Sequence, residues 1–255
     1  MNLYGVKTPL IRPGDDLVPV ILDALNNQGL ELKEGDIIAI TSKVVSIAQN
    51  RLVRFDTVNP SERARDLAQK YDLEPGFVEL VLNEANEVYG GVYRALLTLK
   101  DGILLANSGI DHKNIPSGLA VLLPKEPDKV AADIRRGVEK RIGKRIGVMI
   151  IDSRTVPLRM GTLGVAIGVS GFNPIKDCRG ELDLHGNPLL ITRIAIADDL
   201  ACAAHILMGE LAEKVPIVLI RDAPVEFDES ASGATARINK NECLYMRIFR
   251  PKPLM

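Results

Sequence analysis

Cysteine and aromatic residues are scarce in this sequence, and it has no long hydrophobic run. The three cysteines, Cys178, Cys202 and Cys243, are widely spaced and form no C-x-x-C pair. This pattern argues against a structural zinc site and predicts a reduced, intracellular protein. Tryptophan is absent and aromatic residues make up only 4%, which disfavours a base-stacking surface for single-stranded nucleic acid. No apolar stretch reaches the roughly 18 residues that a membrane-spanning helix needs.

The sequence also lacks an excess of charge of either sign. Lysine and arginine number 32, aspartate and glutamate number 33, and the formal net charge is -1. Such a balance provides no global field that would hold nucleic acid or an anionic membrane. The N-terminus has no basic stretch followed by an apolar run, as a secretory signal would have. We therefore expect a cytoplasmic protein without nucleic-acid or membrane partners.

The rest of the composition is that of an ordinary globular protein. Hydrophobic residues make up 46% of the 255 residues and charged residues 25%, which argues against disorder. Short apolar runs alternate with amphipathic segments, and this predicts an α+β fold of mixed sheets and packed helices. We expect a single domain over residues 1–255, in which the pattern weakens after Arg221.

Capping residues and apolar spacing locate the main elements. Helices are predicted to begin after Asp15 and Asp16, at residues 59–62, near residue 130, and at Asp198 with a strong pattern that runs to residue 215. Buried strands are predicted at residues 36–41, 146–151 and 217–220, and the Asp101-Gly102 pair predicts a hairpin turn. Residues 228–233 (DESASG) are predicted to form a mobile loop.

The common phosphate-binding and hydrolase motifs are missing, and the acidic candidates stand instead just after apolar strands. Asp111 and Asp152 both follow such a strand, and Glu210 comes from a third element. Carboxylates of this kind suit Mg²⁺, but an aspartate at a strand end is also a common turn or cap residue, and spacing alone does not show that the three converge. Lys43 leaves another strand and is able to bind phosphate as a point charge, although a solvated surface charge is the simpler interpretation. His205 lies inside a helical pattern and is interpreted as structural.

Taken in order, these segments resemble the coenzyme F420-0:L-glutamate ligase (F420 gamma-glutamyl ligase) family. The resemblance runs from residue 8 to about residue 221, and although no single stretch is specific, the ordered set is. It implies a catalytic core at about 8–221 and leaves residues 222–255 as a weakly assigned tail. The matching stretches are residues 11–17 (IRPGDDL), 41–46 (TSKVVS), 59–64 (NPSERA), 108–111 (SGID) with Asn114, 151–153 (IDS), 165–168 (VAIG), Asp183 with Gly186, 197–201 (ADDLA), 208–210 (MGE) and 216–221 (PIVLIR).

The resemblance implies a GTP-dependent amide ligase with an interleaved α+β fold. It implies that L-glutamate, followed by further gamma-linked glutamates, is added to coenzyme F420-0 through an acyl-phosphate intermediate. It also implies two divalent ions, Mg²⁺ or Mn²⁺, with K⁺ as an activator, and a homodimer. Phosphoryl transfer depends on positioning and charge neutralisation more than on a protein nucleophile, which agrees with the lack of a visible Ser-His or Cys-His pair.

The same motifs imply which residues form the site. Lys43 and Asp152 are the implied catalytic residues. The implied metal ligands are Asp111, Asp152, Ser153 and Glu210. The implied nucleotide contacts are Thr8, Pro9, Leu10, Ile11, Ser42, Lys43, Ile47, Asn114, Met208, Gly209, Glu210, Leu211, Ala212, Glu213, Lys214 and Val215.

One position departs clearly from the family pattern. Relatives commonly have Ser-Lys-x-x-Ser-Lys at positions 42–47, and here the second lysine is replaced by Ile47. The stretch that follows Asp152 also differs, with Arg154 in it. Two alternatives therefore stay open: a divergent nucleotide- and metal-dependent ligase that acts on another carboxylate acceptor, and a nucleotide-binding protein without catalysis. Retention of all four implied metal ligands disfavours the second alternative.

Overall fold

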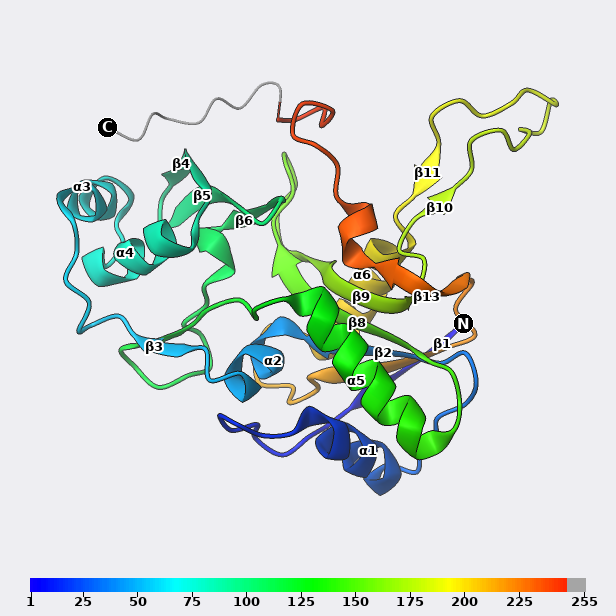
Figure 1. Cartoon of the computed structure of the whole chain (residues 1–255). Coiled ribbons are helices and arrows are strands. Elements are labelled where there is room, and N and C mark those ends of the chain that lie inside the picture. The colour runs from blue at the N-terminus through cyan, green and yellow to red at the C-terminus, as the bar shows by residue number, and fades with distance from the viewer. Residues whose placement is uncertain (247–255) are drawn as a thin grey trace.

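The computed structural model describes residues 1–246 and is built around a six-stranded sheet (Figure 1). Its strands lie in the order β1-β12-β2-β8-β9-β13. β2 and β8 pair in parallel, and the other neighbours are antiparallel. The strands are β1 (Asn2–Val6), β2 (Ile37–Thr41), β8 (Gly147–Arg154), β9 (Leu163–Phe172), β12 (Ile217–Arg221) and β13 (Phe227–Ser232).

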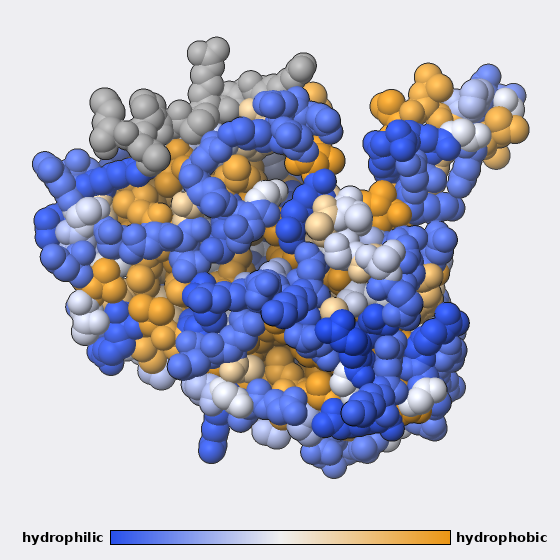
Figure 2. Space-filling view, in the orientation of Figure 1, coloured by the Kyte–Doolittle hydropathy of each residue, from blue (hydrophilic) through white to orange (hydrophobic). Residues whose placement is uncertain are grey.

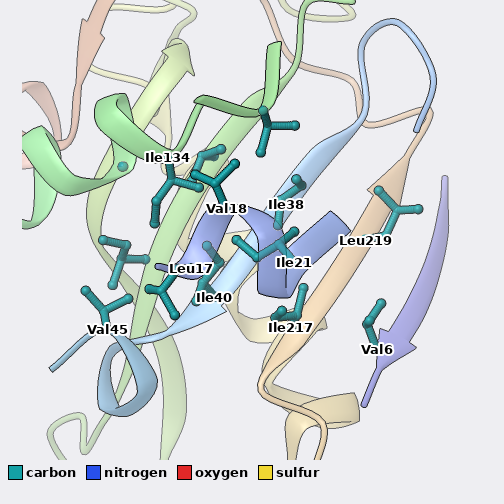
Figure 3. Close-up of a cluster of buried hydrophobic side chains, with 14 of the residues drawn as sticks. Val6, Leu17, Val18, Ile21, Ile38, Ile40, Val45, Ile134, Ile217 and Leu219 are labelled. Atoms are coloured by element: carbon teal, nitrogen blue, oxygen red, sulfur yellow. The ribbon is translucent and has the colours of Figure 1, made fainter. Parts of the chain in front are cut away.

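Both faces of this sheet are buried under helices. Successive residues of a strand point to opposite faces, so Ile38 and Ile40 pack in one core and Ile37 and Ala39 in the other. The first core contains side chains of α1 (Leu17–Asn27), α2 (Ser42–Ala48) and α5 (Pro127–Ile142), and Figure 3 shows part of it. The second core is closed by α6 (Ile196–Met208). Burial on both faces explains why the inner strands β2, β8 and β12 each contain a continuous apolar run.

Local signals in the sequence set the ends of these helices. The Asp16 side chain accepts a hydrogen bond from the Val18 amide and caps α1, as the paired aspartates predict. α5 has Pro127 in its first turn and ends at Gly143, whose φ of 68° is the left-handed conformation that glycine adopts most readily. These residues thus fix where α1 begins and where α5 begins and ends.

A smaller lobe with its own core extends from one edge of this sheet (Figure 1). It consists of α3 (Glu62–Tyr71), α4 (Pro75–Glu84) and a three-stranded antiparallel sheet of β4 (Glu87–Val92), β5 (Ala95–Lys100) and β6 (Ile103–Ala106). The chain enters and leaves it through the paired strands β3 (Leu52–Arg54) and β7 (Leu119–Val121). Glu84 is ion-paired with both Arg51 and Lys100. Asp111 follows the lobe's sheet and forms a backbone bridge to Val121, which returns it towards the main sheet.

A long hairpin projects from the opposite side of the main sheet (Figure 1). Its base is the strand pair β10 (Lys176–Asp177) and β11 (Arg193–Ile194). Beyond that base, Leu184 and Ile191 are almost fully exposed, and Figure 2 shows apolar side chains on this segment. We call residues 176–194 the arm.

The α+β class expected from the sequence is confirmed, and so are most of the expected elements. The Asp101-Gly102 turn joins β5 and β6, with φ positive at both residues, as the hairpin prediction requires. In residues 1–246, no helix has the length and apolarity needed to cross a membrane.

Three local predictions were wrong. The helix expected to reach residue 215 ends at Met208, because Gly209 has φ 68° and ψ -176° and cannot continue it. Residues 228–233 do not form a mobile loop, since β13 spans Phe227–Ser232 and pairs with β9. The helix start predicted at residue 59 lies two residues later, where Ser61 caps α3.

Candidate functional site

A pocket opens at the carboxyl ends of the parallel strands β2 and β8. Polar side chains gather there because both strands end at the same edge of the sheet. The pocket is lined by Thr8, Pro9, Leu10, Ile11, Thr41, Ser42, Lys43, Val44, Ile47, Asp111, Asn114, Ile151, Asp152, Ser153, His205, Met208, Gly209, Glu210, Leu211, Glu213, Lys214, Val215 and Pro216. Of the site residues implied by the sequence, all except Ala212 are in this lining.

Asp152 lies on the pocket floor as the sixth residue of β8. Ser42 begins α2 directly after β2, and its hydroxyl donates a 2.6 Å hydrogen bond to Asp152 Oδ1. Burial raises the pKa of Asp152 to about 6, and the negative charges of Asp111 and Glu210 add to the rise. The Ser42 hydrogen bond acts in the opposite direction. The site therefore contains a carboxylate whose ionised form is poorly compensated.

Asp111 is held by Lys43, which belongs to a different part of the chain. Lys43 Nζ lies 2.6 Å from Asp111 Oδ2 and donates to the Lys113 carbonyl at 3.1 Å. The Lys113 amide in turn donates to Asp111 Oδ1 at 2.8 Å. Burial alone would raise the pKa of Asp111, but the hydrogen bonds and charge supplied by Lys43 and Lys113 outweigh burial and lower it.

Glu210 is the third acidic group, and it accepts hydrogen bonds from several side chains. His205 Nε2 lies 2.8 Å from Glu210 Oε1, and Thr162 Oγ1 donates to the same oxygen at 3.0 Å. Burial opposes ionisation of Glu210, but hydrogen bonds from His205, Thr162 and Ser153 lower its pKa. A carboxylate accepts such bonds best when ionised, so Glu210 is set up as an anion.

The other cations near the site in sequence do not reach the pocket. Arg12 and Arg154 are absent from the lining, although Lys43 and Lys214 are present. Ile47, at the position where the resemblance implies a lysine, is in the lining. Asn114 is also in the lining, and its Nδ2 donates to the Leu211 carbonyl at 2.7 Å. This bond joins the segment after the smaller lobe to the loop after α6.

Sequence reasoning missed two of these contacts. His205 was interpreted as a structural helix residue, yet it lines the pocket and contacts Glu210. Thr162 was not singled out at all. Neither contact is visible in the sequence, because both depend on how the chain turns after Gly209.

The donor chemistry of the pocket fits a hard divalent cation. Within residues 1–246, no three acidic, histidine or cysteine side chains already converge as a metal cluster. In this arrangement Asp111 is engaged by Lys43, Glu210 by His205 and Asp152 by Ser42. The oxygens of Asp111, Asp152, Ser153 and Glu210 are nevertheless the ligand type that Mg²⁺ and Mn²⁺ take. Among the described residues, no ion pair balances the Asp152 carboxylate, and a cation would supply the missing charge.

Comparison with known proteins gives a consistent result over nearly the whole chain. The coenzyme F420:L-glutamate ligase of Methanothermobacter thermautotrophicus is 40% identical over 244 residues, which cover 95% of this chain and 97% of that protein. The ligase of the same name from Methanococcus maripaludis strain C6 is 41% identical over 238 residues, covering 93% and 94%. That of Methanocaldococcus jannaschii is 40% identical over 228 residues, covering 89% and 90%. The profile of the family described as F420-0:Gamma-glutamyl ligase matches residues 5–222, and this chain belongs to that family.

Proposed function

We propose that this pocket uses GTP to join L-glutamate to the carboxylate of coenzyme F420-0, and then adds further gamma-linked glutamates. Membership of the family gives the reaction class, a ligase of coenzyme F420 biosynthesis that adds glutamate to F420-0. The observation that carries the finer proposal is that Asp111, Asp152 and Glu210 line the same pocket as Lys43. This combination suits phosphoryl transfer, in which negative charge must be neutralised and reactants aligned.

The reaction consists of two successive displacements, each with its own leaving group. A carboxylate is a poor electrophile, so one of its oxygens first attacks the gamma-phosphorus of GTP, and GDP leaves. The resulting acyl phosphate is attacked at its carbonyl carbon by the amine of glutamate. Inorganic phosphate then leaves with the electron pair of the broken C–O bond, the amine loses a proton, and an amide remains. Neither displacement requires a covalent bond to the protein.

Four oxygen-bearing side chains would hold two divalent cations, Mg²⁺ or Mn²⁺. They are Asp111, Asp152, Ser153 and Glu210. When bound, such cations neutralise the charge that develops on the transferring phosphoryl group. K⁺ is included in the proposal as an activator on the family resemblance alone. Lys43 contributes a further positive charge close to Asp111, which suits contact with a phosphate oxygen.

The nucleotide would lie against two segments that flank these acids. The pocket lining includes residues 8–11 from the segment after β1, and residues 208–211 and 213–215 at the end of α6 and after it. Ser42 and Lys43 lie at the start of α2, and Asn114 bonds to the second segment. Backbone amides and small polar groups in such loops suit phosphate and ribose oxygens.

Mass spectrometry of the product tests the proposed reaction. The protein is incubated with GTP, Mg²⁺, L-glutamate and F420-0, and each reactant is omitted in turn. We expect F420-0 to gain one glutamyl unit and then more, with one GDP formed for each bond. Turnover with a different carboxylate acceptor alone would favour the divergent ligase. Nucleotide binding without turnover on any acceptor would overturn the assignment as a ligase.

Divalent metal and GTP are expected to raise the melting temperature together by more than the sum of their separate effects. A cation that contacts both protein carboxylates and nucleotide phosphates makes the binding of each ligand favour the other. Each ligand stabilises the folded state by mass action, with a gain of about 2.7 kcal/mol at a hundred times its Kd. The measurement is a melting series with Mg²⁺, GTP or both. Strictly additive shifts would contradict a bridging cation, and an equal response to ATP would remove the guanine preference.

Ile47→Lys tests the position at which the chain departs from its relatives. If the position is simply vacant, the new ammonium adds a charge-assisted contact worth about 1.5–3 kcal/mol, which tightens GTP binding roughly ten- to a hundredfold. If the pocket is rebuilt around an apolar group, the lysine lacks a partner and binding weakens. Calorimetric titration with GTP distinguishes the two cases, and Ile47→Met serves as the control for side-chain shape. Unchanged affinity in Ile47→Lys would show that position 47 does not contact the nucleotide.

A cytoplasmic homodimer completes the proposal. The arm supports it because its tip carries several large apolar side chains that the chain itself leaves uncovered. Leu182, Leu184, Leu190 and Ile191 are each at least 67% exposed. Apolar side chains gathered on a projecting hairpin are typical of an interaction surface, and a second copy of the chain is the partner that the resemblance implies. The near-neutral net charge of -1 imposes no strong repulsion between two copies.

A further inference from the structure

His205 is the one histidine among the residues that line the pocket. It lies in the last turn of α6, and its Nε2 is 2.8 Å from Glu210 Oε1. The His205 side chain is 17% exposed, whereas Glu210 is 43% exposed. The imidazole is therefore the better buried partner of the two.

Glu210 depends on other elements for its orientation. It follows Gly209, where the backbone leaves the helix, and belongs to the loop between α6 and β12. A loop carboxylate of this exposure has several rotamers of similar energy unless neighbouring groups select one. Here Thr162, at the end of the loop before β9, and His205, on α6, bond to the same oxygen. Two donors from separate elements thus select a single orientation of the carboxylate.

His205 itself stands on a well-fixed base. α6 packs closely on β9 at Gly164, where an added Cβ would lie 2.3 Å from the Ala201 carbonyl oxygen and 3.0 Å from His205 Cβ. Only glycine at position 164 permits this approach, which keeps the base of the His205 side chain against the sheet. A donor on a packed helix holds its acceptor more exactly than a donor on a loop does.

We propose that His205 is a positioning residue, which donates from Nε2 to Glu210 and, with Thr162, holds that carboxylate in the orientation required to bind a divalent cation. The inference rests on the proposed role of Glu210 as a metal ligand. It requires a hydrogen-bond donor at the Nε2 position and does not require a positive charge. Glutamine supplies an amide N–H at a similar distance from the backbone, and alanine supplies none.

The experiment measures Mn²⁺ binding to the intact protein, without nucleotide, by electron paramagnetic resonance of the free ion. His205→Ala is expected to weaken Mn²⁺ binding about tenfold or more, in line with the effect of losing groups that orient metal ligands. His205→Gln is expected to stay within about threefold of the unaltered protein, because the donor is kept. Thr162→Val should weaken binding and Thr162→Ser should not. Ile206→Ala, on the same turn of α6 and 80% exposed, controls for damage to the helix.

The outcomes separate this inference from the metal site itself. Glu210→Ala is measured beside the other variants. If it weakens Mn²⁺ binding while His205→Ala does not, His205 has no positioning role. If His205→Gln is as weak as His205→Ala, the imidazole acts through its shape or charge and the inference is likewise overturned. If the unaltered protein binds no Mn²⁺, or if Glu210→Ala binds it normally, the proposed metal role of Glu210 fails together with the inference.

Discussion

Asp152→Asn is expected to remove ligase turnover while making the metal-free protein more stable at neutral pH. The loss of turnover should be at least about a hundredfold, because a carboxylate that supports a bound cation contributes several kcal/mol of charge stabilisation. Asparagine preserves the size of the side chain and can still accept the hydroxyl hydrogen bond of Ser42. The assay is the rate of glutamyl addition at limiting Mg²⁺. Full activity under those conditions would show that Asp152 is no metal ligand.

The stability gain follows from the pKa of Asp152. Its pKa is raised from an ordinary value of 3.8 to about 6 by burial and by nearby negative charge. The folded state therefore holds the proton more tightly than the unfolded state does, so ionisation destabilises the fold. The destabilisation is absent below about pH 4, grows between pH 4 and pH 6, and is complete above pH 6. A shift of this size corresponds to roughly 3 kcal/mol at neutral pH, and asparagine removes it.

Urea unfolding in the presence of a chelator measures this effect. At pH 7.5 the variant should be more stable than the unaltered protein by about 1–3 kcal/mol, and at pH 4 the two should be close. Asp133→Asn is a suitable control, since Asp133 lies on α5 with its side chain 55% exposed and paired with Arg136. A variant that is less stable at neutral pH would mean that the Asp152 charge is compensated. Removal of the Asp152 charge is thus expected to lower activity and raise stability, a trade-off that is common at functional sites with an uncompensated charge.

Much of the fold is predictable because local signals and tertiary packing agree. The apolar runs of β2, β8 and β12 are recognisable since both faces of the sheet are buried. The end of α6 is not predictable in this way, because Leu207 and Leu211 continue the helical spacing across Gly209. A backbone turn at one glycine overrides that pattern. β13 was missed for a related reason: its residues are mostly polar, and its pairing with β9 depends on contacts distant in sequence.

The individual residues of the candidate site can be predicted from the sequence, but their common place in one pocket cannot. In the sequence, Asp111 and Asp152 follow apolar runs, a position at which a turn or cap residue is a more frequent interpretation than a metal ligand. In the structure, β8 extends past its apolar run to Arg154 and contains Asp152. What distinguishes the two interpretations is the parallel pairing of β2 with β8 and the backbone bridge between Asp111 and Val121. The strand pairing joins segments more than a hundred residues apart, the bridge joins residues ten apart, and no spacing in the sequence encodes either contact. The resemblance to a family implied which residues belong to one site, and the local pattern did not.

Lys43→Met is expected to lower turnover and to tighten Mn²⁺ binding in the absence of nucleotide. In the metal-free protein the Lys43 ammonium lies 2.6 Å from Asp111 Oδ2, so it occupies one oxygen that a cation would need. Removing the ammonium frees Asp111. The ion pair is partly exposed, at 29% and 38%, and pairs of this kind contribute roughly 0.2–1 kcal/mol. The gain in Mn²⁺ affinity should therefore be at most about fivefold.

The affinity of Lys43→Met for GTP is expected to fall, and by a larger factor than its affinity for Mn²⁺ rises. Methionine keeps the length of the side chain and lacks its charge, so a charge-assisted phosphate contact worth about 1.5–3 kcal/mol is lost. Affinity for GTP, and turnover at low GTP, should fall roughly ten- to a hundredfold. Calorimetry measures the affinity for GTP, and titration followed by electron paramagnetic resonance measures the affinity for Mn²⁺. Lys129→Met, at an exposed position of α5, is the control. Weaker Mn²⁺ binding in Lys43→Met would show that Lys43 orients Asp111 for the metal. Stronger binding would show that the lysine competes with the metal and must leave Asp111 before it can contact the nucleotide.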